Sequence, residues 1–203
     1  MSTLTIGIVD YGVGNLGSIH RTLRNLGYRC RVSRHPGELN ETDLLLLPGV
    51  GAFPAAMQAL HDCFLVEYLQ QQARQGKPIV GICLGMQLLA DTSTEYRLTA
   101  GLGLIPGEVT PLQNVRWHIG WNTIEVLNGD QLLQPSDGQS FYFNHSFVFE
   151  AAHEYQIGAA RLDRPLTAAV RRGSVVGLQF HPEKSQIAGR ILLRNVIEGL
   201  CGA

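Results

Sequence analysis

The sequence lacks several features that would place the protein in a membrane, on nucleic acid or outside the cell. It has no apolar run approaching the ~18 residues that span a bilayer. No basic segment precedes the apolar residues 4–9, so we expect no signal peptide. Basic blocks are absent too, and 16 Lys and Arg against 17 Asp and Glu give a net charge of −1. We therefore expect a cytoplasmic protein with no membrane and no nucleic acid among its partners.

Cysteine is scarce and scattered. The four cysteines show no C-x-x-C pairing, which argues against a disulfide framework and a zinc site in Cys30, Cys63, Cys83 and Cys201. Charged residues make up only 16% of the chain, whereas hydrophobic residues make up 45%. Such a composition fits a chain that covers part of its surface with a partner. We expect neither a metal ion nor a cofactor.

The N-terminal part of the sequence alternates between strand and helix patterns. The apolar runs predict strands at residues 5–10, 30–33, 44–47 and 78–82. Helical periodicity and stop signals predict helices at residues 16–26, 54–60, 65–75 and 84–90, with Asn15 as the N-cap of the first. This alternation is typical of a parallel sheet covered on both faces.

After residue 90 the pattern changes to short β-runs separated by turns. We expect strands at residues 119–126, 141–149, 155–160, 166–170 and 175–180, with a hairpin turn at residues 171–174. A last amphipathic helix is predicted at residues 188–200. Because no linker divides the chain, we interpret residues 1–203 as one α/β domain. Its central, mainly parallel sheet is flanked by helices and carries an antiparallel β extension.

One stretch, Gly81-Ile82-Cys83-Leu84-Gly85, places a cysteine at a sharp turn between a strand and a helix. Small residues two before and two after the cysteine are what such an elbow needs, because side chains there would collide. Unpaired N–H groups at a helix N-terminus stabilise a thiolate and can bind an oxyanion. The pattern predicts that Cys83 is a nucleophile. The alternative is a cysteine that only packs between two glycines.

A histidine and a carboxylate follow the last predicted strand, 181 − 83 = 98 residues after the cysteine. Pro182 holds His181 in an extended conformation, in which side chains two residues apart point to the same side. His181 and Glu183 can therefore meet, and a carboxylate on one ring nitrogen leaves the other basic toward a thiol. We expect this pair to converge with Cys83 at one sheet edge; the alternative is a structural histidine.

The glycines near the N-terminus form a pattern that also occurs in dinucleotide-binding proteins. Gly12-x-Gly14-x-x-Gly17 matches the dinucleotide-binding fingerprint and lies between a predicted strand and a predicted helix. The fingerprint also requires an acidic residue at the end of the second strand. That strand runs instead into Arg34, which could hold a 2′-phosphate. NADP binding is therefore an alternative interpretation of this segment.

Six motifs in order resemble the class I (triad) glutamine amidotransferase family and cover nearly the whole chain. They are D-Y-G-V-G-N at residues 10–15, P-G-V-G at 48–51, G-I-C-L-G-M-Q at 81–87, G-W-N at 120–122, H-S at 145–146 and Q-F-H-P-E-K-S at 179–185. The elbow alone is a weak signal, but the elbow, the H-P-E motif and the P-G-V-G loop in this order are specific to the family.

The resemblance implies a Cys-His-Glu triad that hydrolyses L-glutamine. Cys83 would attack the side-chain amide and form a thioester as ammonia leaves, while His181 transfers the proton and Glu183 orients it. The N–H groups of Leu84 and Val50 would form the oxyanion hole, and a flip of the Val50 loop would act as an off switch. The family positions around the bound glutamine fall on Gly51, Gln87, His145, Ser146 and Phe147.

The family also implies a partner that consumes the ammonia. Ammonia released into water at neutral pH is mostly protonated and no longer nucleophilic, and one catalytic domain leaves no room for a second site. The resemblance implies a heterodimer with a (β/α)8 cyclase of histidine biosynthesis, joined by an internal ammonia channel. The positions that face the synthase in the family are Asn15, Trp121 and Lys184.

Other interpretations differ in partner or chemistry. Asn144 and Trp117 depart from the usual family residues, and a paralogous subunit could feed another synthase, such as one that amidates a sugar. A stand-alone cysteine hydrolase would use the same elbow without a partner. A chain that has lost catalysis would remain as an interaction module, although all three triad residues are present.

Overall fold

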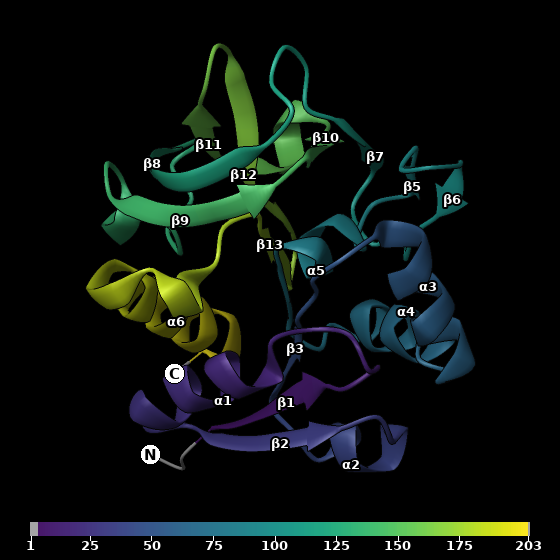
Figure 1. Cartoon of the computed structure of the whole chain (residues 1–203). Coiled ribbons are helices and arrows are strands. Elements are labelled where there is room, and N and C mark those ends of the chain that lie inside the picture. Colours follow the sequence, from purple (N-terminus) through teal and green to yellow (C-terminus); the bar gives the residue numbers. More distant parts are fainter. Residues whose placement is uncertain (1–3, 203) are drawn as a thin grey trace.

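The computed structural model describes residues 4–202, and over this range the chain forms two sheets with helices around the larger one (Figure 1). The larger sheet has nine strands in the order β2-β1-β3-β4-β13-β12-β11-β8-β9, and the smaller has four in the order β10-β7-β5-β6. The strands are β1 Thr5–Val9, β2 Arg29–Ser33, β3 Leu44–Leu47, β4 Ile79–Ile82, β5 Thr92–Ser93, β6 Thr99–Ala100, β7 Gly107–Pro111, β8 His118–Val126, β9 Ser140–His145, β10 Phe147–Ala151, β11 Gln156–Arg161, β12 Pro165–Arg172 and β13 Val175–Leu178. The helices are α1 Leu16–Asn25, α2 Pro36–Asn40, α3 Phe53–Asp62, α4 Val66–Arg74, α5 Leu84–Gln87 and α6 Gln186–Cys201.

The parallel half of the large sheet is buried on both faces. Leu44 and Leu46 of β3 belong to one core with the apolar stripes of α1 and α6, whereas Leu45 and Leu47 belong to a second core with α3 and α4. Figure 1 shows the two pairs of helices on opposite sides of β3. Successive side chains of a strand alternate between its two faces, so a run of four leucines fits only a strand covered from both sides. The predicted helices on both faces are confirmed.

The other half of the large sheet is antiparallel. β13 pairs in parallel with β4 and antiparallel with β12. The predicted hairpin turn joins β12 to β13, and Gly173 in this turn has φ +58°. β11, β8 and β9 continue the sheet in antiparallel pairings. The predicted fold class, a parallel sheet extended by antiparallel strands, is confirmed.

The structure differs from the predicted elements near Ser146. Residues 141–149 were predicted as one strand, but they belong to two strands that separate at Ser146. β9 pairs with β8 in the large sheet, and β10 pairs with β7 in the small sheet. The chain therefore changes sheets at this residue. The small sheet was not predicted, because two of its strands are only two residues long and have no alternation to detect.

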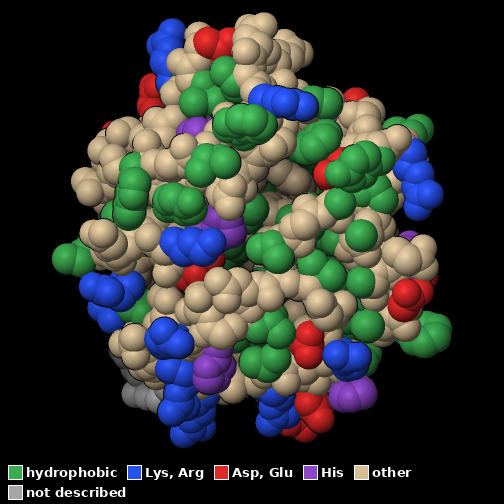
Figure 2. Space-filling model, in the orientation of Figure 1, with side chains coloured by type: hydrophobic (Ala, Val, Ile, Leu, Met, Phe, Trp, Pro, Cys, Tyr) green, Lys and Arg blue, Asp and Glu red, His purple; other side chains and the backbone are tan. Residues whose placement is uncertain are grey.

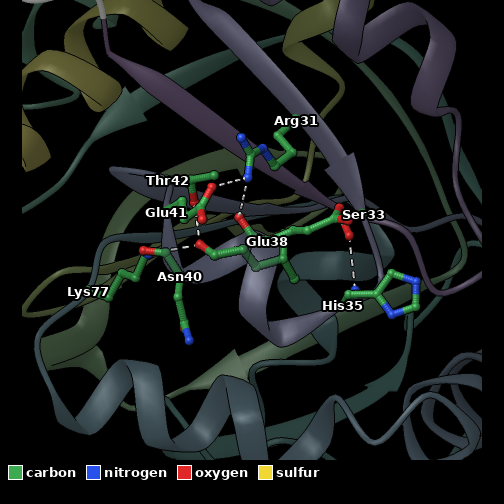
Figure 3. A network of polar contacts seen from close by, with 9 residues as sticks. Arg31, Ser33, His35, Glu38, Asn40, Glu41, Thr42 and Lys77 are labelled. Atoms are coloured by element: carbon green, nitrogen blue, oxygen red, sulfur yellow. Dashed lines mark hydrogen bonds and ion pairs between the residues drawn. The ribbon is translucent and has the colours of Figure 1, made fainter.

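Helix α2 was also not predicted, and polar contacts hold its short turn in place (Figure 3). Lys77 Nζ donates hydrogen bonds to the carbonyls of Leu39 (3.0 Å) and Asn40 (3.1 Å) at the C-terminal end of α2. Partial burial lowers the pKa of Lys77. Arg31 pairs with Glu41 at the exposed side of the same corner. In the described part of the chain, no helix combines the length and apolarity that a bilayer crossing requires.

Replacing Lys77 should destabilise the fold more than replacing Arg31. We expect Lys77→Met to lower the free energy of unfolding by about 2 kcal/mol, because two carbonyls lose a charged donor. Arg31→Met serves as the control and should cost less than about 1 kcal/mol, because its ion pair with Glu41 is exposed. Urea unfolding of both variants measures the difference. Equal losses would show that the contacts of Lys77 contribute nothing specific.

Candidate active site

The backbone around Cys83 forms a strained elbow between β4 and α5. Cys83 has φ +55° and ψ −113°, a backbone conformation that residues other than glycine rarely adopt. A side chain at Gly81 would lie 2.5 Å from the carbonyl oxygen of Gly85, and one at Gly85 would overlap the carbonyl oxygen of Leu47. The prediction that both flanking glycines are sterically required is confirmed.

Helix α5 is shorter than predicted. It ends at Gln87 instead of residue 90, because the next N–H groups bond three residues back instead of four: Leu89 N donates to Met86 O (3.1 Å) and Ala90 N donates to Gln87 O (3.0 Å). Leu102 N donates to Leu88 O (2.8 Å), and Leu104 N donates to Leu89 O (2.9 Å). A single turn has a weaker dipole than a full helix, but its first N–H groups still lack intrahelical partners. Unpaired N–H groups therefore lie directly after the cysteine.

A cavity of about 370 Å³ opens above the elbow. It gathers residues from the P-G-V-G loop, the elbow, the β9–β10 junction and the segment after β13. Ten of the predicted site residues line it: Val50, Gly51, Cys83, Leu84, Gln87, His145, Ser146, Phe147, His181 and Lys184. The fold thus brings together residues that lie far apart in the sequence.

His181 and Glu183 form a buried pair beside this cavity. His181 Nδ1 lies 2.8 Å from Glu183 Oε1, and the two side chains are 4% and 1% exposed. Burial works to lower the pKa of His181, but hydrogen bonds to Cys83 and Glu183 outweigh it and raise this pKa to about 9. The imidazole therefore carries a positive charge at neutral pH, between a thiol and a carboxylate.

The second oxygen of Glu183 strengthens this assignment of charge. No other described residue donates a hydrogen bond to Oε2, which is buried. A buried carboxylate with one unpaired oxygen is costly unless a charged partner offsets it. Protonated His181 is that partner. Ser185 supports the histidine from behind, because its Oγ donates to His181 O (2.7 Å) and accepts from Tyr142 N (3.0 Å).

The P-G-V-G loop packs against the elbow. Tyr11 Oη donates to Pro48 O at 2.7 Å, and burial raises the pKa of this phenol so that it keeps its proton. A side chain at Gly49 would lie 2.7 Å from Gly85 N. Val50 follows, half-exposed at the cavity mouth. One end of the loop is fixed against α5 while its tip faces the cavity.

The three predicted partner-facing residues lie near the cavity and are exposed. Asn15 caps α1, as predicted, by accepting a hydrogen bond from Ser18 N. Trp121 packs edge-on against Tyr142, and Lys184 Nζ lies 5.7 Å from the centre of the same ring. Figure 2 shows hydrophobic side chains around a hollow on this face. Large exposed apolar residues of the chain include Tyr96, Trp117, Ile119 and Trp121.

Three cavity residues, Glu95, Tyr96 and Asn144, received no role from the sequence, and neither did Gln179 next to Cys83. Glu95 is buried and lines the cavity, and its carboxylate accepts a hydrogen bond from Phe53 N (2.7 Å) at the start of α3. Asn144 also lines the cavity, and its carbonyl lies 3.9 Å from Cys83 Sγ. Gln179 is fully buried with its amide nitrogen 4.0 Å from the same sulfur. Gln179 stood in a recognised motif and Asn144 was a departure from the usual family residue, whereas Glu95 had no sequence signal.

The glycine fingerprint lies at the start of α1. Gly12 and Gly14 have positive φ angles of 85° and 136°. Arg34, the residue that would hold a 2′-phosphate, lies 3.5 Å from Asp10 and pairs with it. A carboxylate beside that arginine competes with a phosphate. This contact weakens the NADP interpretation.

The family described as glutamine amidotransferase class-I matches residues 7–198. The chain is a class I glutamine amidotransferase. The family predicted from the six motifs is thus confirmed.

Relatives of this amidotransferase align over nearly its whole length. The imidazole glycerol phosphate synthase subunit HisH of Streptococcus gordonii is 42% identical, with 94% of each chain covered. The subunit of the same name from Lacticaseibacillus casei is 44% identical, with 95% of each chain covered. Among solved structures, PurLQS from Thermotoga maritima aligns with a TM-score of 0.77 at 19% identity, covering 98% of this amidotransferase and 100% of that chain. That likeness shows the shared fold.

Adding a side chain at the elbow should disrupt the amidotransferase fold. We expect Gly85→Ala to lower the free energy of unfolding by more than about 2 kcal/mol, because the new methyl group overlaps the Leu47 carbonyl. Gly17→Ala in α1 is the matched control, since nothing lies within 4 Å of its added carbon. This control should be neutral or stabilising by up to about 1 kcal/mol. Thermal or urea unfolding distinguishes the two, and a neutral Gly85→Ala would contradict the steric account.

His181 should make the free energy of unfolding depend on pH. Its pKa is about 9 in the folded chain against 6.5 ordinarily, so the charged imidazole stabilises the fold fully below pH 6.5 and this contribution is lost as the pH rises through about 9. Relative to His181→Gln, the unmodified chain should lose more than about 1 kcal/mol between roughly pH 7 and 10. Urea unfolding at both pH values measures this loss. A constant difference between the two chains would refute the raised pKa.

Proposed function

We propose that this chain is the glutaminase subunit of an imidazole glycerol phosphate synthase and hydrolyses L-glutamine to glutamate and ammonia. The observation that carries the proposal is the position of Cys83, on a strained elbow in a cavity that also contains His181. The end-to-end likeness to HisH subunits supports the same reaction and its place in histidine biosynthesis.

The triad performs the reaction in two stages. The sulfur of Cys83, beside charged His181, attacks the side-chain amide carbon of glutamine as a thiolate. The resulting oxyanion accepts hydrogen bonds from the N–H of Leu84 and from the P-G-V-G loop at Val50. His181 then gives its proton to the amide nitrogen, the C–N bond of the tetrahedral intermediate breaks, and ammonia leaves while the thioester forms. Water, deprotonated by His181, hydrolyses the thioester, while Glu183 keeps the ring oriented.

The cavity suits a small amino acid. Its volume of about 370 Å³ lies at the lower end of the range for ligand sites. The Glu95 carboxylate on the wall supplies a negative charge for the α-ammonium group of glutamine. Gln87 and the junction residues His145, Ser146 and Phe147 also line the cavity. With the α-ammonium group at Glu95, the amide end of glutamine would reach Cys83, which lines the same cavity.

A partner receives the ammonia. The exposed apolar residues near the cavity, with Asn15, Trp121 and Lys184, form the face on which a (β/α)8 cyclase docks as a heterodimer in the cytoplasm. Docking over the cavity keeps ammonia out of water, where protonation would remove its nucleophilic lone pair. It also acts on the Val50 loop, whose tip lies at the cavity mouth.

The triad can be tested by ammonia release from L-glutamine in the presence of the cyclase and its nucleotide substrate. We expect Cys83→Ala to abolish release and His181→Ala to lower it by more than about 10³-fold, because both take part in bond making. Glu183→Gln should lower it by less, about 10- to 100-fold, since the amide still contacts the ring.

Each outcome separates one interpretation from another. Ammonia release by the Cys83→Ala variant would contradict the proposed mechanism. If the unmodified chain stays inactive with this cyclase but a glutamine-like chloroketone labels Cys83, the chemistry holds and the partner is another synthase. Glu67→Gln, an exposed change in α4 away from the cavity, should behave like the unmodified chain.

A further inference from the structure

A continuous line of hydrogen bonds, through six side chains and the backbone carbonyl of Phe147, leads from strand β8 to the sulfur of Cys83. Its members come from five separate segments of the chain, and most of them are buried. Neither the triad nor the oxyanion hole uses the middle of this line. In order along the line, its residues are Asn122, His118, His145, Phe147, Gln87, Gln179 and Cys83.

The first part of the line contains two buried histidines that face each other across β8 and β9. His118 and His145 are directly paired in the strand register, and His118 Nδ1 lies 2.9 Å from His145 Nε2. His145 Nδ1 lies 2.8 Å from the carbonyl oxygen of Phe147. A carbonyl only accepts, so His145 carries its proton on Nδ1 and presents a bare Nε2. His118 must therefore donate from Nδ1.

The outer end of the line is fixed in the same way. Asn122 Nδ2 lies 3.1 Å from His118 Nε2 and also donates to Arg161 O (2.9 Å). Its Oδ1 accepts from Thr123 N (2.8 Å), which sets the orientation of the amide. Burial lowers the pKa of both His118 and His145 to about 4, so both rings are neutral at physiological pH. Each ring can then have only one tautomer.

The second part of the line reaches the nucleophile. Gln87 Nε2 donates to Phe147 O (3.0 Å) and to Gln179 Oε1 (3.0 Å), so Phe147 O receives hydrogen bonds from both sides. Because Oε1 of Gln179 is occupied by Gln87, its Nε2 must face Cys83 Sγ, 4.0 Å away. An amide N–H directed at sulfur favours the thiolate over the neutral thiol.

We propose that His118 is a positioning residue for the reaction and that Gln179 is a second hydrogen-bond donor to the Cys83 thiolate. His118 acts through His145 on the carbonyl of Phe147, and that carbonyl fixes Gln87, which in turn fixes the amide of Gln179. The proposal rests on the proposed role of Cys83 as the nucleophile. The line does not conduct protons, since His145 and Gln87 both donate to the same carbonyl.

Removing His118 would leave a buried nitrogen without a donor. His145 Nε2 would then rotate to find another partner, and the Phe147 carbonyl would lose one of its two donors. Gln87 would become free to turn, so the amide of Gln179 would no longer be held with its nitrogen toward sulfur. The effect of a change on β8 would thus reach Cys83 without any contact between the two.

Four variants of the full chain separate this role from simple packing. His118→Phe keeps the stacking on Phe143, whose ring centre lies 4.4 Å away, but removes both hydrogen bonds. His118→Asn places an amide nitrogen near the original Nδ1 and should restore the donor to His145. Gln179→Leu removes the last donor. Gln72→Leu, at another buried glutamine whose amide bonds Gln75 within its own segment, is the matched control.

The readout is the rate at which iodoacetamide alkylates Cys83 across pH, followed by mass spectrometry of the peptide because Cys30, Cys63 and Cys201 are also free. We expect Gln179→Leu to slow labelling at neutral pH about tenfold and to move the midpoint of the profile about one unit higher. His118→Phe should slow labelling about three- to fivefold and should also move the midpoint of the profile to higher pH. His118→Asn and Gln72→Leu should match the unmodified chain.

Two outcomes would overturn the proposal. Labelling of Gln179→Leu at the unmodified rate and midpoint would show that the amide does not act on the thiolate. Equal slowing by His118→Phe and His118→Asn would show that packing, not the hydrogen bond, matters at this position. Failure of the proposed function is distinguishable from either, because then a glutamine-like chloroketone would not label Cys83 even in the unmodified chain.

Discussion

The backbone of Gly85 lies so close to the carbonyl of Leu47 that no side chain fits between them, and the cavity depends on that contact. It brings the end of β3 against the first turn of α5, so the loop after β3 and the elbow after β4 share one wall. The positive φ of Cys83 then points the sulfur out of the sheet. Close backbone packing thus places the nucleophile next to the loop, and the hydrogen bond from Tyr11 Oη to Pro48 O adds to it.

The opposite wall of the cavity comes from a strand that changes sheets. At Ser146 the chain leaves the pairing with β8 and enters the pairing with β7, so this one residue lies where the large and small sheets meet. A kink between two sheets exposes carbonyl groups that a continuous strand would use in its ladder. Phe147 O is such a group, and both His145 and Gln87 use it.

Much of the fold was visible in the sequence because it depends on local patterns. The leucines of β3, the glycines around Cys83 and the turn at Gly173 each have one physical explanation, and the structure agrees with all three. Long-range features had no such signal. Nothing around Glu95 indicated that its carboxylate would bond Phe53 N at the start of a distant helix. Likewise, the register that places His118 opposite His145 follows from strand pairing, which a single sequence does not specify.

The contacts that hold the backbone of His181 have a consequence for synthesis on the ribosome. Ser185 bonds the histidine carbonyl, and Gly189 of α6 lies so close to the Pro182 carbonyl that a side chain there would overlap it. The base is therefore held in place only after the last helix of the chain has docked. The cysteine is translated 181 − 83 = 98 residues earlier than the histidine. A nascent chain thus contains the sulfur long before it contains the histidine beside it, so the pair is assembled only when folding is nearly complete.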